Sequence, residues 1–340
     1  MSYHVTIQPS GHKFQVAAGE TILDAAINAS FNLPYGCRNG TCGACKGRVL
    51  EGRVEHKSHQ SSALIQAEKD SGLALFCCAI PQSDVVIECR EVSTNNGIRP
   101  RIMPARVQKI EKLADDVIAL SLKLPSNERL QFLAGQYIEF LLKDGQRRAF
   151  SLANAPHDDE LLELHLRHVP GGQFTDHVFT QMQEKAILRL EGPFGSFYLR
   201  EESEKPIIFV AGGTGFAPIK GMIEHLLHVG SKRKMLLYWG ARALKDLYLP
   251  ALPQTWRDAN EHLSFIPVLS EPLSADTWQG RTGLLHQAVL DDLGDLSAYQ
   301  VYCFGAPIMV DTVRTSFHAA GLPADEFFAD AFTYANPSAN

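Results

Sequence analysis

Long apolar segments are missing from this sequence of 340 residues: no run approaches the ~18–20 apolar residues of a membrane-spanning helix. A basic excess is missing too, because the formal net charge is −6, which argues against a nucleic-acid-binding protein. The N-terminal residues show no charged segment followed by an apolar one, so no signal peptide is expected. We therefore expect a cytoplasmic protein that binds neither membranes nor nucleic acids.

Cysteines are few and unevenly spaced. There are seven, an odd number, and three of them fall between residues 37 and 45. This crowding suits a metal site in a reducing compartment better than a disulfide framework. With 45% hydrophobic and 21% charged residues, the composition is that of a globular protein, and at ~100–150 residues per domain the length predicts two or three domains.

Two changes of composition predict the domain boundaries. A polar stretch with two prolines, residues 93–104, is typical of a linker, and a charged stretch, residues 200–206, precedes a strongly apolar segment. We therefore predict a first domain over residues 1–93, a linker over 94–104, a second domain over 105–203 and a third over 204–340.

Hydrophobic spacing predicts a different fold class for each domain. The first is expected to be a small α+β module with a hairpin (3–7 and 13–16), a helix (21–29) and a last strand (85–89). The second is expected to be an antiparallel barrel with one helix (176–182) and strands at 106–110, 117–122, 137–142, 162–167 and 187–190. In the third, alternating segments predict a parallel sheet with helices on both faces, with strands at 207–211, 235–239, 263–268 and 301–304 and a helix at 218–228.

Cys37, Cys42 and Cys45 form a C-x4-C-x2-C pattern, the plant-type spacing for a 2Fe–2S cluster. Interleaved glycines permit the tight wrap that brings three thiolates onto one small inorganic core. The fourth ligand is Cys77 or Cys78, because neighbouring residues on an extended segment point to opposite faces and only one of them reaches the cluster. A zinc site or a redox disulfide is the alternative, which this spacing disfavours.

A short strand in the second domain carries residue types that suit a flavin. Arg148 would supply charge to a pyrophosphate, Phe150 would pack on the ring or the ribityl chain, and Ser151 would hydrogen-bond the reactive nitrogen. A glycine turn with Thr175 at a helix start follows, and such a turn exposes N–H groups to phosphate. Taken alone, the strand is better explained as an edge strand with an exposed arginine.

A glycine-rich loop, residues 212–215, follows a buried strand and precedes a helix in the third domain. This is the setting in which a loop binds pyrophosphate at a helix N-terminus, although the pattern is not G-x-G-x-x-G; a tight turn without a ligand is the alternative. Beyond the next strand, Asp246 would accept from a free 2′-hydroxyl, which favours NADH, whereas Arg242 would meet a 2′-phosphate.

The motifs R-x-F-S, Gly-Gly-x-x-Thr, G-P-x-G and G-G-T-G-x-A-P, in this order and at these distances, resemble the ferredoxin–NADP reductase superfamily. The resemblance implies a β-grasp 2Fe–2S ferredoxin, an antiparallel β-barrel that binds FAD, with FMN as the rival cofactor, and an α/β parallel-sheet domain that binds NADH, with NADPH also possible. The family pattern Leu-x-Cys places the fourth cluster ligand at Cys77 and leaves Cys78 as a buried small residue. Cys89 is expected in the core.

The same resemblance implies the other site residues. The implied flavin residues are Tyr137, Arg148, Phe150, Ser151, Leu152, Arg167, Gly172 and Thr175. The implied nicotinamide-nucleotide residues are Gly212, Gly213, Thr214, Gly215, Arg242, Asp246 and Gly305. Two residues are implied to be catalytic: Ser151, near the reactive flavin nitrogen, and Phe332, covering the flavin face on which nicotinamide stacks.

One position departs from the family pattern. The family's cysteine directly before Gly305 is here Phe304, and Cys303 lies one residue earlier. A shift of one residue on a strand reverses the side-chain face, so we expect Cys303 to be a buried core thiol without a part in hydride transfer.

The order of the three parts resembles the reductase components of bacterial oxygenases and the CDP-6-deoxy-Δ3,4-glucoseen reductases. It implies electron flow from NADH to FAD, to the cluster and then to a partner protein, a dehydrase as first choice and an aromatic or alkane oxygenase as alternative. A redox-sensing interaction module is the third possibility. Partner docking is expected at an exposed rim near the cluster, at Arg38, Asn39 and Thr41, and the chain is expected to be a monomer.

Overall fold

The computed structural model describes residues 2–91 and 98–332, and they divide into two compact units. The first unit takes the described residues up to 100 together with the short segment 194–197; the second takes residues 101–193 and 198–332. Part of the predicted linker, residues 94–97, lies outside the described residues, as does the end of the third predicted domain, residues 333–340. Residues 101–104 begin a strand instead of belonging to a linker, and the predicted domain boundaries otherwise stay a prediction.

The first unit is built on a mixed five-stranded sheet, in the order β2-β1-β7-β3-β5. β1 (Ser2–Gln8) pairs antiparallel with β2 (Lys13–Ala17) and parallel with β7 (Val85–Glu88), as in a β-grasp fold. Thr21 caps α1 (Ile22–Asn28) by accepting the N–H of Asp24, and the apolar face of this helix is buried. The predicted hairpin, helix and last strand are confirmed; the remaining elements are β3 (Lys46–Glu51), β4 (Val54–His56), α2 (Gln66–Asp70), β5 (Leu73–Leu75) and β6 (Ala79–Pro81).

The second unit begins with an antiparallel barrel, whose sheet has the order β11-β10-β13-β8-β9-β12. A bridge between Leu152 and Leu164 joins the chain at the two outer strands, and the inward side chains form one apolar core. This confirms the predicted barrel. Its elements are β8 (Arg101–Ala114), β9 (Val117–Lys123), β10 (Tyr137–Leu141), β11 (Arg147–Ser151), β12 (Leu162–Arg167), α3 (Gln173–Thr180) and β13 (Ile187–Phe194).

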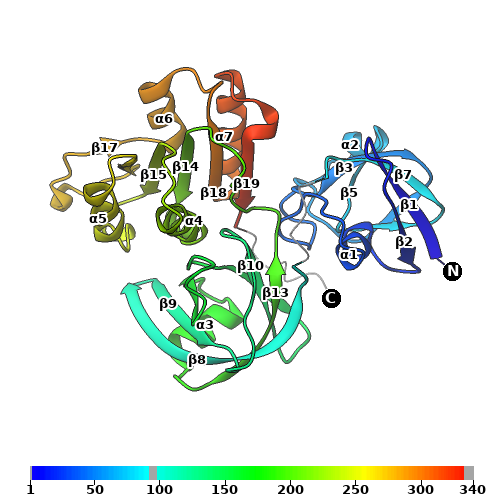
Figure 1. The fold of residues 1–340 in the computed structure, drawn as a ribbon, viewed down its shortest axis with the longest axis horizontal. Helices are drawn as coiled ribbons and strands as arrows, with labels where there is room; N and C mark the ends of the chain where they lie inside the picture. Colours follow the sequence, from blue (N-terminus) through cyan, green and yellow to red (C-terminus); the bar gives the residue numbers. More distant parts are fainter. Residues whose placement is uncertain (1, 92–97, 333–340) are drawn as a thin grey trace. The chain divides into compact units, whose positions relative to one another are not determined.

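A six-stranded sheet follows in the same unit, in the order β17-β16-β15-β14-β18-β19, and every pairing in it is parallel. Helices α4 and α5 lie on one face and α6 and α7 on the other, as predicted (Figure 1). The elements are β14 (Ile207–Gly212), α4 (Phe216–His228), β15 (Met235–Ala241), α5 (Ala251–Ala259), β16 (Leu263–Leu269), β17 (Arg281–Thr282), α6 (Leu285–Leu293), β18 (Gln300–Gly305), α7 (Pro307–Ala319) and β19 (Phe327–Ala331). α4 begins two residues before the predicted position.

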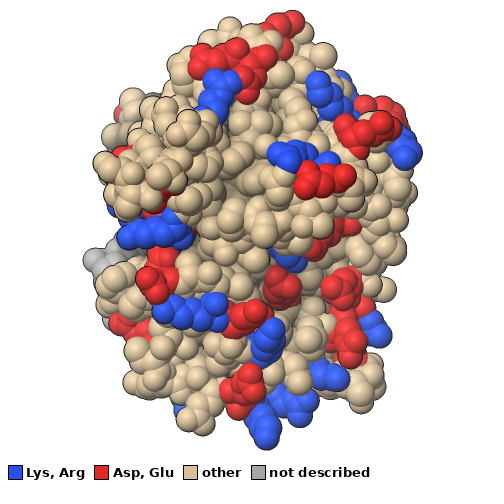
Figure 2. Space-filling model, turned by 90° about the vertical axis from the view of Figure 1, so that its left-hand side faces the viewer, with Lys and Arg blue, Asp and Glu red and all other residues tan. Residues whose placement is uncertain are grey.

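Charged side chains of both signs are interspersed over the face drawn in Figure 2, in keeping with the mild net charge of −6. Among the described residues, none of the helices has the length and apolar character that crossing a membrane requires.

Candidate functional site

The loop between α1 and β3 and the turn between β5 and β6 bring cysteine thiols together in pairs. The main-chain N–H of Cys37 donates to the Sγ of Cys42 (3.3 Å), and the N–H of Cys42 donates to the Sγ of Cys37 (3.3 Å). In the second pair, the N–H of Cys77 donates to the Sγ of Cys45 (3.5 Å). Two pairs of thiols match a binuclear core, because a 2Fe–2S cluster takes four cysteines, two on each iron.

The main chain around these thiols also suits a cluster. The N–H groups of Thr41 and Ala44 donate to Cys37 (3.4 Å) and Cys42 (3.5 Å), and such donors stabilise sulfur that carries negative charge. Gly40 has φ +76°, and a Cβ there would lie 2.7 Å from the Sγ of Cys78. Main-chain donors therefore reach the thiols of Cys37, Cys42 and Cys45, as suits sulfur ligands of a 2Fe–2S cluster.

The two candidates for the fourth ligand have different surroundings. The Cys77 thiol hydrogen-bonds with the thiol of Cys45, and hydrogen bonds from Cys45 and Cys78 lower the pKa of Cys77 to about 4. The thiolate is the form that binds metal. The Cys78 thiol instead approaches the carbonyl of Ser58 (3.8 Å), and its bond with Cys77, together with burial, raises its pKa. These surroundings favour Cys77, the choice that the family resemblance implies.

The expected docking rim needs a correction. The Arg38 side chain is only 20% exposed, because its guanidinium pairs with Asp24 (2.9 Å) and lies 4.2 Å from the ring centre of Phe194. Thr41 is half-buried and donates its hydroxyl to the side chain of Asn39 (2.6 Å). Of the three predicted rim residues, Asn39 alone is exposed.

The start of the cluster loop is anchored by a segment distant in sequence. The hydroxyl of Ser196, which belongs to the first unit, accepts the N–H of Tyr35 (2.9 Å) and donates to its carbonyl (2.9 Å). The N–H of Ser196 donates to the same carbonyl (3.1 Å). Because Tyr35 stands two residues before Cys37, these bonds fix the position at which the first predicted ligand enters the loop.

Three of the predicted flavin residues lie on the outer strand β11, on its two faces. Arg148 and Phe150 stand opposite Phe140 and Ile138 of β10, both of which point into the barrel core. Ser151 stands opposite Tyr137 and shares its face, because alternate residues of a strand point to opposite sides. The strand therefore presents an arginine and a hydroxyl on opposite faces.

Several predicted flavin residues already have partners inside the protein. The Phe150 ring packs at 5.4 Å from Phe174, Leu152 is fully buried, and the Thr175 hydroxyl bonds the carbonyls of Val169 (3.1 Å) and Gly172 (3.2 Å). Thr175 thus stabilises the turn at the start of α3, and Leu152 can contribute to a cofactor site through its main chain.

Arg167, at the end of β12, is the predicted residue with an unmet hydrogen-bonding need. One of its guanidinium nitrogens pairs with Asp116, whereas Nη2 is buried and has no hydrogen-bond partner among the described residues. This nitrogen lies 3.6 Å from the position of a Cβ on Gly213. A buried donor without a partner is costly, and a phosphate oxygen between the barrel and the glycine loop would satisfy it.

The predicted nucleotide loop closes tightly at the carboxyl end of the parallel sheet. Gly213 has φ +55°, and a Cβ on Gly215 would lie 2.2 Å from the carbonyl oxygen of Phe304. Cβ atoms on Gly212 and Gly305 would lie 2.7 and 2.4 Å from Met309. Thr214 is buried within the loop, and α4 starts directly after it. A glycine loop leading into a helix at this edge of the sheet fits a pyrophosphate.

Phe304 and Phe332 form an aromatic pair beside this loop. Their rings are 5.2 Å apart in an edge-to-face arrangement, and the N–H of Phe332 donates to the carbonyl of Gly305 (2.9 Å). Cys303 is fully buried in the core on the side of α6 and α7, which confirms that it is a core thiol; its absence from hydride transfer stays a prediction. Cys89 is half-buried, so it was wrong to expect it in the core.

Two carboxylates surround the end of β15, where the ribose was predicted to bind. Asp246 accepts the N–H of Ala243 (3.0 Å), and Asp276 accepts the N–H groups of Leu244 (3.2 Å) and Leu273 (2.9 Å). Arg242 is exposed. The sequence did not point to Asp276, since 30 residues separate it from Asp246.

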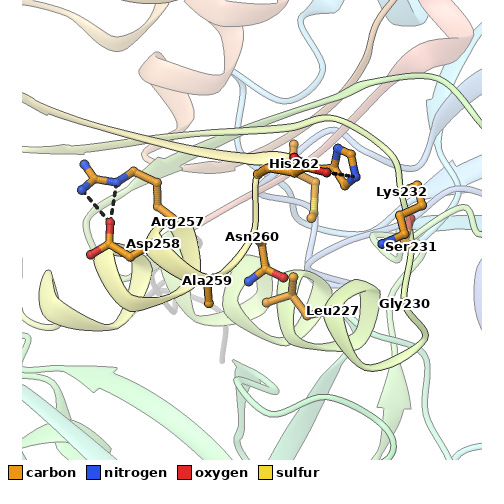
Figure 3. Close-up of a pocket in the computed structure, with 11 residues that line it drawn as sticks. Leu227, Gly230, Ser231, Lys232, Arg257, Asp258, Ala259, Asn260 and His262 are labelled. Carbon is orange, nitrogen blue, oxygen red and sulfur yellow. Dashed lines mark hydrogen bonds and ion pairs between the residues drawn. The ribbon is translucent and has the colours of Figure 1, made fainter.

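A pocket of about 510 Å³ lies elsewhere on the parallel-sheet domain, where α4 and α5 end (Figure 3). Its charged lining includes Lys232 and an Arg257–Asp258 ion pair. Met235, the first residue of β15, also lines it. The pocket therefore lies at the amino ends of the strands, whereas the glycine loop lies at their carboxyl ends, and the two are separate.

Sequence patterns also missed a buried polar network in the second unit. Lys220 of α4 lies 3.4 Å from Glu163 of β12 and donates to the carbonyl of Ala153 (3.1 Å). His165 bonds both Glu163 (2.7 Å) and Tyr248 (2.9 Å). The only available signal was polar residues at alternate positions of a buried strand.

Comparison with known proteins identifies three domains along the chain. Residues 5–82 match the 2Fe-2S iron-sulfur cluster binding domain, residues 104–198 the oxidoreductase FAD-binding domain and residues 209–315 the oxidoreductase NAD-binding domain. The chain is 38% identical to the CDP-6-deoxy-L-threo-D-glycero-4-hexulose-3-dehydrase reductase of Yersinia pestis, covering 98% of this chain and 99% of the relative. It is 36% identical to reductase component 2 of terephthalate 1,2-dioxygenase from Comamonas sp, covering 98% of each.

Among solved structures, a cytochrome P450 reductase of Amycolatopsis matches with a TM-score of 0.83 and 31% identity, covering 98% of this chain and 99% of that one. The chain therefore belongs to the family of NAD(P)H-dependent iron–sulfur flavoprotein reductases, in which a 2Fe–2S ferredoxin domain is joined to FAD-binding and NAD-binding domains.

Proposed function

We propose that this reductase delivers electrons from NADH to a sugar-deoxygenating dehydrase, and that its cluster is held by Cys37, Cys42, Cys45 and Cys77. The observation that carries the nucleotide-binding part of the proposal is the buried, unsatisfied Nη2 of Arg167 beside the glycine loop, because it needs an anionic group where the barrel meets the sheet. The dehydrase reductase of Yersinia pestis supports the choice of partner. An oxygenase component is the second candidate, supported by the terephthalate dioxygenase reductase.

The residues of this chain are assigned the following roles in binding the cofactors. Arg167 and the N–H groups of residues 212–215 bind pyrophosphate, and Arg148 adds charge on the barrel side. Phe332, half-buried against Phe304, covers the site from water. When bound, FAD supplies the exchange between a two-electron hydride donor and a one-electron cluster.

NADH is proposed over NADPH because of the two carboxylates at the end of β15. Asp246 and Asp276 occupy main-chain N–H groups that a 2′-phosphate would need, and their charges oppose a phosphate. A free 2′-hydroxyl, by contrast, can donate to a carboxylate.

The direct test is anaerobic addition of NADH to the holoprotein, followed by EPR. We expect the flavin absorbance to bleach and a reduced 2Fe–2S signal to appear, at lower concentrations of NADH than of NADPH. Reduction by dithionite is the control, because it shows whether the cluster is intact even if electrons from NADH do not reach it. A cluster that dithionite reduces and NADH does not would contradict the proposed electron path, and a preference for NADPH would contradict the role of Asp246.

The partner is proposed to dock beside the cluster loop, at Asn39. This residue is exposed, and Gln60, which is also exposed, lies next to it in the fold, since its N–H donates to the carbonyl of Gly40 (3.1 Å). Both side chains are uncharged, so docking there would depend weakly on salt.

We expect Asn39→Glu to slow reoxidation of the NADH-reduced protein by the dehydrase severalfold, because a charge would be desolvated at the contact. Gln15→Glu, an exposed change on β2, is the matched control. Reduction of ferricyanide at the flavin should be unchanged in both variants. Equal reoxidation rates for Asn39→Glu and the control would rule out docking at this rim, and reoxidation only by an oxygenase component would favour the second candidate.

A further inference from the structure

A buried imidazole links the barrel to the parallel-sheet domain within the second unit. The His165 side chain has no exposed surface, and both of its ring nitrogens have partners inside the protein. Nε2 lies 2.7 Å from Glu163 Oε1 on the same strand, and Nδ1 lies 2.9 Å from the hydroxyl of Tyr248, which follows β15. Tyr248 is buried as well.

The charges fix the direction of both hydrogen bonds. Burial alone would raise the pKa of Glu163, but His165 and Lys220 outweigh it and hold that pKa at about 2. The ionised carboxylate can only accept, so Nε2 carries the proton. Burial lowers the pKa of His165, so the ring is neutral and Nδ1 accepts the hydroxyl proton of Tyr248. A single tautomer therefore satisfies the whole chain of bonds.

One further side chain connects Tyr248, and with it the hydrogen bonds of His165, to the glycine loop. Its ring meets Trp239 of β15 edge to face, with centres 5.1 Å apart. The indole N–H of Trp239 donates to the carbonyl of Gly213 (2.9 Å), and its ring stacks on Phe216, the first residue of α4 (4.0 Å). Strand β12 is thus linked to the glycine loop in two ways. One link runs from His165 through Tyr248 and Trp239, and the other is Arg167, two residues after His165.

Helix α4 is clamped to the same region of the barrel. Lys220 donates to the carbonyl of Ala153 and pairs with Glu163, and its side chain is only 9% exposed. A Cβ on Gly221 would lie 2.7 Å from the carbonyl oxygen of Asn154, so the helix backbone lies directly on the barrel chain. Ala153 and Asn154, which make these contacts, lie two and three residues after Ser151, the predicted neighbour of the reactive flavin nitrogen.

We propose that Glu163, His165, Tyr248 and Trp239 are positioning residues for hydride transfer: together they hold the Gly213 loop, and with it the bound nicotinamide nucleotide, at a fixed place against the flavin barrel. The inference rests on the proposed function, because transfer from NADH to FAD is the step whose geometry they set. None of the four is assigned contact with the reacting atoms; each acts through the next. Such positioning matters because a misplacement of about 1 Å can cost on the order of 10²-fold in rate.

The first test is stopped-flow reduction of the holoprotein by NADH. Tyr248→Phe removes the hydroxyl and keeps the ring on Trp239, so we expect the limiting rate of flavin reduction to fall about tenfold, with unchanged FAD and iron content. Tyr238→Phe is the matched control, because its hydroxyl bonds Asp292 (2.9 Å) in the core on the other face of the sheet. A limiting rate for Tyr248→Phe equal to that of the control, with only a lower Tm, would overturn the proposal.

Two conservative variants of His165 give a second test that does not depend on Tyr248→Phe folding. Asparagine places an acceptor near Nδ1 and keeps the bond from Tyr248, whereas glutamine places a donor near Nε2 and keeps the bond to Glu163. We expect His165→Asn to retain most of the limiting rate and His165→Gln to lose it about tenfold. Equal rates, or the reverse order, would overturn the proposal. A wild-type flavin that NADH does not reduce would instead refute the proposed function.

Discussion

The variant Cys77→Ser is expected to lack a 2Fe–2S cluster, with no charge-transfer absorbance and no EPR signal after dithionite. The N–H of Cys77 already donates to Cys45, and the two thiols form the pair that would hold one iron. Removing one of the four thiolates leaves that iron with a weaker oxygen ligand. Purified protein should contain a small fraction of the wild-type iron and sulfide, whereas NADH should still bleach the flavin, because the FAD-binding and NAD-binding domains keep their residues.

Cys78→Ser is the matched control, since it makes the same change one residue later. The Cys78 thiol approaches the carbonyl of Ser58, and serine can keep a hydrogen bond there, so iron content and the EPR signal should stay near wild type. Loss of the cluster in Cys78→Ser with retention in Cys77→Ser would reverse the ligand assignment. Loss in both variants would point to a packing requirement at this turn instead of a single ligand.

Gly215→Ala is expected to lower the rate of flavin reduction by NADH by on the order of 10²-fold. The added Cβ would lie 2.2 Å from the carbonyl oxygen of Phe304 and 2.7 Å from its carbonyl carbon, distances that force the main chain of one segment to move. Either movement shifts the loop that we assign to the pyrophosphate. Stopped-flow absorbance at the flavin band measures the effect, and the cluster should remain reducible by dithionite.

Gly145→Ala provides the comparison for that change. Gly145 lies in the turn between β10 and β11 with φ +81°, and nothing lies within 4 Å of its would-be Cβ. This variant should lose about 1 kcal/mol of stability from the backbone conformation alone and reduce its flavin at the wild-type rate. Near-normal flavin reduction in Gly215→Ala would show that the loop does not determine how the nucleotide binds.

Local patterns predicted most of the fold correctly, and the main difference occurs at β8. Prolines at 100 and 104 favoured a linker, yet β8 begins at Arg101. Its pairing with β13 includes Pro104, opposite Arg189, whereas pairing with β9 begins only at Arg106. A proline is tolerated there because this part of the strand has a neighbour on one side only, as an edge strand has.

Site residues were predictable where spacing along the chain carries the chemistry, as in the three crowded cysteines and the glycine loop. They were not predictable where distant residues meet. Arg38 was expected on an exposed rim because the sequence gives no hint that Asp24 and Phe194 hold it. The bond between His165 and Tyr248 joins residues 83 apart, and only the packing of α4 and β15 against β12 brings them together.

The anchoring of Tyr35 by Ser196 has a consequence for biogenesis. The residues that form the ferredoxin sheet leave the ribosome well before Ser196, yet three hydrogen bonds that fix the entry to the cluster loop depend on it. A nascent chain that ends before this serine carries all four predicted ligands without that support. We therefore expect the completed polypeptide to take up metal with a cluster loop that these bonds already hold in place. A fragment that ends at residue 100 lacks Ser196 and therefore lacks all three bonds.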